Sequence, residues 1–258
     1  FRNVRMFSQS KRQINQAQSL RSASLAQAGV PLEKITFVDH HTAHASSAYY
    51  GLADYEDRIL VLTNDGAGDG ICATVNVGYG GRLQRISAIT EDNSLATIYA
   101  MVTYMMGMTP LEHEYKIMGL APYYRGDVDK NAVYQGLLEV FEWDPENPMQ
   151  WCRSAGIPRV GYLWKYLDEL LTIERFDTIA AGVQAFVEHF LVEWVRRCIR
   201  ETGLSRLAVS GGTFMNVKAN QAILSLPEVD ELFVFPSCGD ETNSVGAAYW
   251  YYANQKLS

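Results

Sequence analysis

The sequence is poor in cysteine, has no long apolar run and carries no excess of positive charge. Its four cysteines are Cys72, Cys152, Cys198 and Cys238. They are far apart and form no C-x-x-C pair, which argues against a disulfide framework and against a zinc knuckle. No apolar stretch approaches the roughly 20 residues of a membrane-spanning helix, so we expect no membrane partner. The 22 lysines and arginines are outnumbered by 29 aspartates and glutamates, and the net charge of −7 argues against nucleic acid as a partner.

The composition that remains is that of an ordinary globular protein, with 48% hydrophobic and 20% charged residues. A chain of 258 residues corresponds to one large domain or two small ones. No secretory leader stands at the N-terminus, so we expect a cytoplasmic protein. The chain begins with Phe1 in a polar, helix-like stretch, which predicts a fragment of a longer protein.

Strand and helix patterns predict an α/β fold. Three apolar strands are expected at 58–63, 71–79 and 82–90, and two more at 206–210 and 231–235. The first three form a meander, which implies antiparallel pairing, whereas the later strands alternate with helices, which implies parallel crossovers. We therefore expect one mixed sheet with helices on both faces. We also expect a strand at 35–38, a surface excursion at 143–158, and helices at 10–28, 40–50, 94–106, 128–141, 162–171, 178–201, 216–224 and 243–254.

Three of the five histidines lie within five residues, directly after Asp39. On a helix, His40 and His44 are one turn apart and point the same way, which lets two imidazoles share one metal ion. His41 faces about 100° away and is assigned another role. A capped helix with hydrogen-bonded histidines is the alternative explanation. A third metal ligand has to come from elsewhere, and Asp240 is the candidate, unless it only caps the helix that follows it.

A glycine-rich turn follows the first predicted central strand. Its glycines allow the backbone to approach an anion, and its carboxylates can hold the accompanying cation, although a simple hairpin turn explains the pattern equally well. Farther on, Lys116 stands in an otherwise apolar segment and is a candidate for neutralising a phosphate or carboxylate, or else part of a solvated helix edge. The candidate binding residues of the turn are Asp65, Gly66, Gly68 and Asp69.

Two later segments each follow a strand and open a helix, which is where α/β proteins bind nucleotides. The first contains Gly211, Gly212 and Asn216, and the second contains Asp240 and Asn243. Neither is a Walker A loop or a G-x-G-x-x-G fingerprint. If the strands are parallel, these segments and the glycine-rich turn meet at one edge of the sheet.

Taken together, five motifs resemble the O-carbamoyltransferase family named after NodU and CmcH. They are HHTAHASSAYY, DGAGDG, EHEYKIMGLAPY, SGGTFMNVKAN and PSCGDETNSVGAA, in the family's order and over most of the chain. The resemblance implies an ASKHA-type fold built from ribonuclease-H-like halves. On this view, residues 1–57 are the remnant of a truncated first half. Residues 58–258 are the second half, with a helical insertion at about 108–177.

The resemblance also implies roles for individual residues. His40 and His44 match the family's metal pair and Asp240 its distal carboxylate ligand, with Fe²⁺ as the usual divalent metal. The two glycine-rich loops and Lys116 match the walls of the site for ATP or carbamoyl adenylate. The implied reaction transfers a carbamoyl group from carbamoyl phosphate, through carbamoyl adenylate, to a hydroxyl of a sugar or other small molecule. A YrdC-like C-terminal domain, which this chain is expected to lack, makes the adenylate, and His41 is our candidate for the base that takes the hydroxyl proton.

Three other functions remain open at this point. Threonylcarbamoyl transfer to tRNA uses a similar fold, but the net charge of −7 argues against it. A kinase or ATPase of the same fold would bind Mg²⁺ through carboxylates, and the histidine cluster argues against that. A non-catalytic nucleotide-binding module would bind ATP without turnover. The sequence contains no motif for the carbamoyl acceptor, so the acceptor is left unassigned.

Overall fold

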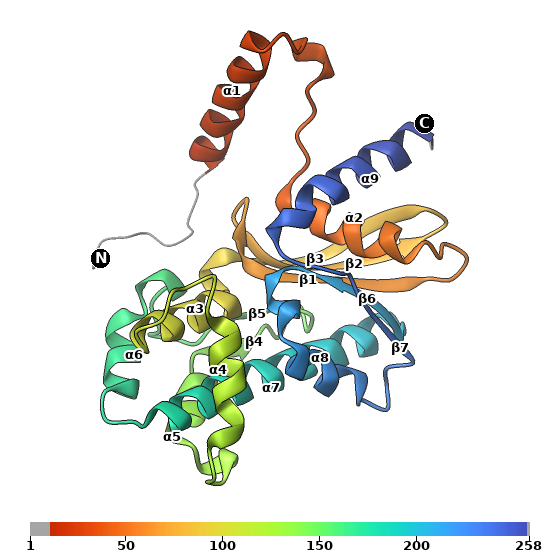
Figure 1. Cartoon of the computed structure of the whole chain (residues 1–258). Coiled ribbons are helices and arrows are strands. Elements are labelled where there is room, and N and C mark those ends of the chain that lie inside the picture. Colours follow the sequence, from red (N-terminus) through yellow and green to blue (C-terminus); the bar gives the residue numbers. More distant parts are fainter. Residues whose placement is uncertain (1–10, 257–258) are drawn as a thin grey trace.

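The computed structural model describes residues 11–256 and is built around a five-stranded mixed sheet (Figure 1). The strand order is β3-β2-β1-β6-β7. Neighbours β1–β2 and β2–β3 are antiparallel, whereas β1–β6 and β6–β7 are parallel. This is the mixed sheet predicted from the sequence, with the strand arrangement of a ribonuclease-H-like half. The strands are β1 (Ile59–Gly68), β2 (Ile71–Tyr79), β3 (Arg82–Thr90), β6 (Arg206–Ser210) and β7 (Glu231–Val234).

Strand β1 is central because both of its faces are apolar and covered. Ile59 and Val61 pack against helix α2 (His40–Leu52) on one face. Leu60 and Leu62 join the larger core on the opposite face. All four side chains are fully buried, as expected for a strand flanked by helices on both sides.

Helices cover both faces of the sheet, as predicted (Figure 1). Helices α2 and α9 (Asn243–Lys256) lie together on one face. They cross closely at Gly246, whose lack of a side chain allows the contact: an added Cβ would lie 1.9 Å from the Ala43 carbonyl oxygen. The other face carries α3 (Leu95–Met105), α7 (Phe176–Thr202) and α8 (Val217–Leu224).

A helical region follows α3 and packs against α7. It contains α4 (Glu114–Leu120), α5 (Ala132–Leu138), α6 (Trp164–Leu171) and the two-stranded sheet of β4 (Phe141–Trp143) and β5 (Trp151–Arg153). The remaining elements are α1 (Lys11–Gln27) and the 3₁₀ helices η1 (Leu32–Lys34), η2 (Glu91–Asn93), η3 (Ala121–Tyr123), η4 (Val128–Lys130), η5 (Val160–Tyr162), η6 (Gly212–Met215) and η7 (Asp240–Thr242). Within residues 11–256, every helix is too short or too polar to cross a membrane.

Several predicted helix ends agree with the structure, and two predicted segments do not. Asp39 caps α2 and Ser94 caps α3, as their side-chain types suggest. Residues 35–38 are extended but pair with no strand in the described part of the chain, so the predicted strand is wrong. The surface excursion predicted at 143–158 is also wrong, because Trp151 is buried there and its indole donates a hydrogen bond to the Asn93 carbonyl (2.8 Å).

Candidate metal centre

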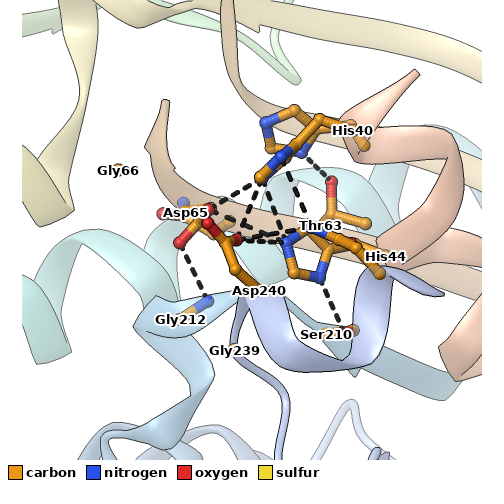
Figure 2. A network of polar contacts seen from close by, with 12 residues as sticks. His40, His44, Thr63, Asp65, Gly66, Ser210, Gly212, Gly239 and Asp240 are labelled. Carbon is orange, nitrogen blue, oxygen red and sulfur yellow. Dashed lines mark hydrogen bonds and ion pairs between the residues drawn. The ribbon is translucent and has the colours of Figure 1, made fainter. Parts of the chain in front are cut away.

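Four side chains from three separate segments converge at one edge of the sheet (Figure 2). His40 and His44 come from the start of α2, Asp65 from the last part of β1, and Asp240 from η7. One donor atom of each lies within 4.8 Å of every other. The structure thus brings together the three residues predicted as metal ligands and adds Asp65 to them.

The distances within this four-residue cluster suit donors that share one ion. The two Nε2 atoms of His40 and His44 are 3.1 Å apart, and His40 Nε2 lies 2.9 Å from Asp65 Oδ2. Asp240 Oδ1 lies 3.3 Å from His44 Nε2 and 3.4 Å from His40 Nε2. Ligands bound at about 2.0–2.2 Å to one metal ion are roughly 3.0–3.5 Å from one another. Two imidazoles and two carboxylates are also a donor set that divalent metals accept.

His40 is held in place by the glycine-rich turn. The Asp69 carboxylate accepts a hydrogen bond from the His40 backbone N–H (2.9 Å). Gly68 lies directly against the imidazole, since a Cβ added there would be 2.1 Å from His40 Cγ. Gly68 and Asp69, predicted as nucleotide-binding residues, therefore contact the cluster itself in this structure.

Asp65 is held by the glycine pair that follows β6. The Gly212 backbone N–H donates to Asp65 Oδ1 (3.1 Å), and a Cβ at Gly212 would lie 2.8 Å from the same oxygen. Gly211 has a φ of +107° and approaches the Asn64 backbone too closely for any side chain. The Gly211 N–H donates to the Cys238 carbonyl (2.9 Å), which links the loop after β6 to the loop after β7. The three loops after β1, β6 and β7 therefore meet at one sheet edge, as parallel strands require.

The charges of the cluster shift the pKa values of its buried members. Burial lowers the pKa of His44, but hydrogen bonds to Asp240 and Asp65 outweigh it and raise the pKa to about 8. Burial raises the pKa of Asp65, but hydrogen bonds with His40 and His44 bring it well below its usual value. Two carboxylates next to two imidazoles thus favour a cation, either a proton or a metal ion.

His41 has a different environment from its two neighbours. Its Nε2 lies 3.0 Å from the Ile71 carbonyl and its Nδ1 lies 2.7 Å from Thr63 Oγ1. A carbonyl only accepts, so Nε2 carries the hydrogen and Nδ1 accepts from the Thr63 hydroxyl. Burial lowers the pKa of His41 to about 3. Both nitrogens are occupied in a buried site, which does not fit the general base predicted from the sequence.

The chain of hydrogen bonds from His41 continues through the sheet. Thr63 Oγ1 lies 2.6 Å from Thr74 Oγ1, and the Asn76 amide donates to Thr74 (2.9 Å). On the other side, His44 Nδ1 lies 3.3 Å from Ser210 Oγ. These contacts orient α2 so that His40 and His44 face the carboxylates. The sequence did not predict that Thr63 and Ser210 contact the histidines, because a buried Thr or Ser in a strand has no distinctive pattern.

The other predicted binding residues are placed in different ways. Asn243 Nδ2 is 3.4 Å from His40 Nδ1 and lies beside the cluster. Gly66 has open space at the position of an added Cβ, whereas its carbonyl accepts a hydrogen bond from Thr97 Oγ1 (3.3 Å). Asn216 caps α8 and exchanges two amide hydrogen bonds with Gln184 (both 3.0 Å), which leaves little of its side chain for a ligand. Lys116 is exposed on α4, with its ammonium 5.8 Å from the Tyr115 ring centroid, and it is not part of the cluster.

Comparison with known proteins bears on this arrangement. The sequence model described as "Carbamoyltransferase N-terminus" matches residues 11–249. The chain belongs to the carbamoyltransferase N-terminus family. This confirms the resemblance drawn from the five motifs, and the family match spans all four residues of the His–Asp cluster and all three loops.

Individual relatives share the family at lower identity. The nodulation protein NolNO of Sinorhizobium fredii is 29% identical over 223 residues, which cover 83% of this chain and 31% of that protein. The nodulation protein NolO of Bradyrhizobium diazoefficiens is 29% identical over 219 residues, covering 82% of this chain and 37% of that protein. This carbamoyltransferase N-terminus domain thus spans less than half the length of the curated relatives it matches.

Among solved structures, full-length HypF in a phosphate- and nucleotide-bound form resembles this domain with a TM-score of 0.49. The two share 15% identity, and the match covers 84% of this chain and 43% of the HypF chain.

Proposed function

We propose that this domain is the carbamoyl-transferring part of an O-carbamoyltransferase. It would move a carbamoyl group from carbamoyl adenylate to a hydroxyl of a small molecule, such as a sugar, an antibiotic or a nodulation-factor-type metabolite. The observation that carries this proposal is the four-residue cluster of His40, His44, Asp65 and Asp240. It lies where three glycine-bearing loops meet, in a chain of the carbamoyltransferase N-terminus family.

The cluster would hold one divalent metal ion, and Fe²⁺ is the candidate. The donor set of two imidazoles and two carboxylates suits iron, and it contains no thiolate that would favour a softer metal. A bound divalent ion supplies Lewis-acid stabilisation for charge that develops on a carbamoyl or phosphate oxygen. Asp65 would be a fourth ligand, beside the three residues that the sequence suggested.

The chain's own residues would bind and orient the adenylate. The open space beside the Gly66 Cα would let a phosphate or ribose come close, and Asn243 would offer an amide beside His40. In the transfer, the acceptor oxygen forms a bond to the carbamoyl carbon, and the bond from that carbon to the adenylate phosphate breaks. AMP leaves and the hydroxyl proton is released to water, since His41 has no free nitrogen to accept it.

Formation of the adenylate is a separate reaction that we assign to another part of a longer protein. There, in a YrdC-like domain of the same polypeptide, water would cleave carbamoyl phosphate to carbamate and inorganic phosphate. The carbamate oxygen would then bond to the α-phosphate of ATP and displace pyrophosphate. The present domain carries the transfer motifs, and it matches less than half of its curated relatives. The present domain would thus bind the nucleotide as carbamoyl adenylate and not as ATP.

Elemental analysis of the purified protein tests the proposal. We expect about one metal ion per chain, and we expect His44→Ala to lose it. The matched control is His189→Ala, which removes an exposed histidine of α7 outside the cluster. Equal metal content in His44→Ala and His189→Ala would contradict the metal assignment. In the full-length protein, His44→Ala should also abolish carbamoyl transfer to the acceptor.

A further inference from the structure

A cavity of about 620 Å³ lies outside the metal centre, between α2, β3 and α9. Its volume falls within the range of roughly 300–1,000 Å³ that small-molecule sites occupy. Figure 1 shows α9 lying over α2, on the side of the sheet that α2 covers. The residues that characterise its walls are Thr42 and Tyr50 of α2, Arg82 and Arg85 of β3, and Trp250 and Asn254 of α9.

The cavity is separated from the metal centre by α2 itself. At 100° per residue, Thr42 lies about 160–200° around the helix from His40 and His44. None of the four cluster residues lines the cavity. A molecule bound here would therefore contact the opposite side of α2 and could not serve as carbamoyl donor or acceptor at the cluster.

Two arginines line the walls, and the Asp39 carboxylate beside them forms an ion pair with Arg85. The Arg85 guanidinium is fixed by hydrogen bonds to Asp39 (2.7 Å) and to Thr42 Oγ1 (3.0 Å), both made through Nη2. Arg82 is exposed and forms no ion pair within residues 11–256. In a chain with a net charge of −7, Arg82 is therefore the positive charge of this cavity that an anion can pair with.

The cavity also offers two aromatic rings. The Tyr50 hydroxyl donates to the Gly81 carbonyl (3.1 Å), which fixes the ring against the β2–β3 hairpin. Trp250 is half-buried, and its backbone carbonyl accepts a hydrogen bond from the Asn254 amide (2.8 Å). Aromatic rings provide flat apolar surface for a planar group, and guanidinium groups bind phosphates and carboxylates well.

We propose that this cavity is a binding site for a small anion that carries a flat ring, of the aryl phosphate or aryl carboxylate class. The Arg82 guanidinium binds the anionic group, beside the ion pair of Arg85 with Asp39. The rings of Trp250 and Tyr50 contact the planar part. The site is independent of carbamoyl transfer, because it shares no residue with the metal cluster.

Isothermal titration with 1-naphthyl phosphate tests this proposal. Two further probes separate its two halves: 1-naphthol has the ring without the charge, and inorganic phosphate has the charge without the ring. We expect 1-naphthyl phosphate to bind at least about tenfold more tightly than either of them, because only it uses both walls. Absence of binding at millimolar concentration, or equal affinity for all three probes, would overturn the proposal.

Variants locate the bound probe. Arg82→Gln and Trp250→Leu should each weaken binding about tenfold, because each removes a direct contact. Arg125→Gln removes an exposed arginine elsewhere and should change nothing. His44→Ala should also leave binding intact, whereas its loss there would mean that the probe binds at the metal centre and would refute the assignment. If thermal unfolding shows that Trp250→Leu is not folded, the test rests on Arg82→Gln, which changes an exposed side chain. Equal affinity of Arg82→Gln and Arg125→Gln for 1-naphthyl phosphate would then contradict the proposed site.

Discussion

At Gly68, the addition of a single methyl group should strongly weaken metal binding while the protein stays folded. In Gly68→Ala the new Cβ would lie 2.1 Å from His40 Cγ, 2.3 Å from Cδ2 and 2.6 Å from Cβ. Ordinary contact begins at 3.4 Å, so the imidazole has to move by more than about 1 Å. Gly68 itself is restrained by its pairing with Ile71 in the β1–β2 ladder.

A displacement of this size exceeds what a metal bond tolerates. Ligand distances in metal sites stay within about 0.2 Å of their usual values, so His40 would no longer bind the ion. We expect the metal affinity to fall at least about 100-fold, while overpacking costs the fold about 1–3 kcal/mol. The assay is a metal titration of folded protein, with circular dichroism to confirm that the variant is folded.

Gly66→Ala is the matched control in the same turn. Nothing lies within 4 Å of a Cβ added at Gly66, and neither glycine has a positive φ, so alanine fits both backbones. Gly66→Ala should therefore bind metal as the unchanged protein does. Equal metal affinity in Gly68→Ala and Gly66→Ala would refute the reasoning, because it would mean that His40 is not held against Gly68 or is not a ligand.

Three other predictions concern the same region. Thr63→Val removes the hydroxyl that donates to His41 and leaves a buried nitrogen unpaired, so thermal unfolding should show a loss of about 1–3 kcal/mol, and an unchanged melting temperature would contradict the contact. In the metal-free protein the pKa of His44 is raised to about 8, so its proton stabilises the fold below pH 6.5 and this contribution is lost as pH rises through about 8. Metal binding must displace that proton, so affinity should fall up to about tenfold per pH unit below pH 8, and titrations in two buffers should detect proton release. Finally, residues 1–258 alone should release no pyrophosphate from ATP and carbamoyl phosphate, and robust release would overturn the division of labour proposed here.

Local patterns were sufficient to predict much of the fold. The order of strands and helices followed from apolar runs, and the caps at Asp39 and Ser94 followed from side-chain type. The strand at 35–38 failed because pairing depends on a partner strand, which local sequence does not reveal. Burial of Trp151 was missed because three prolines nearby suggested exposure, whereas the indole N–H finds a carbonyl in η2.

The candidate site divides in the same way. The spacing of His40 and His44 reveals a shared helix face, since that relation is local. Asp240 lies 196 residues from His44, so its own loop left a metal ligand and a helix cap as equal explanations, and the family motif favoured the ligand. Asp65 was predicted to bind nucleotide and not metal. An aspartate in a glycine-rich turn fits both roles, and the sequence does not show that it lies beside His40. The hydrogen-bond partners of His41 could not be predicted, because Thr63 and Ile71 lie on β1 and β2 and meet His41 only in the folded chain.

X-ray absorption spectroscopy of the iron-loaded protein tests the four-ligand centre most directly. We predict a first shell of nitrogen and oxygen only, at about 2.0–2.2 Å, with the outer-shell scattering of two imidazoles. His44→Ala should lose one imidazole or the ion altogether, and Asp65→Asn should alter the oxygen contribution. Sulfur in the first shell, or an unchanged spectrum in His44→Ala, would contradict the assignment of His40, His44, Asp65 and Asp240 as the metal ligands.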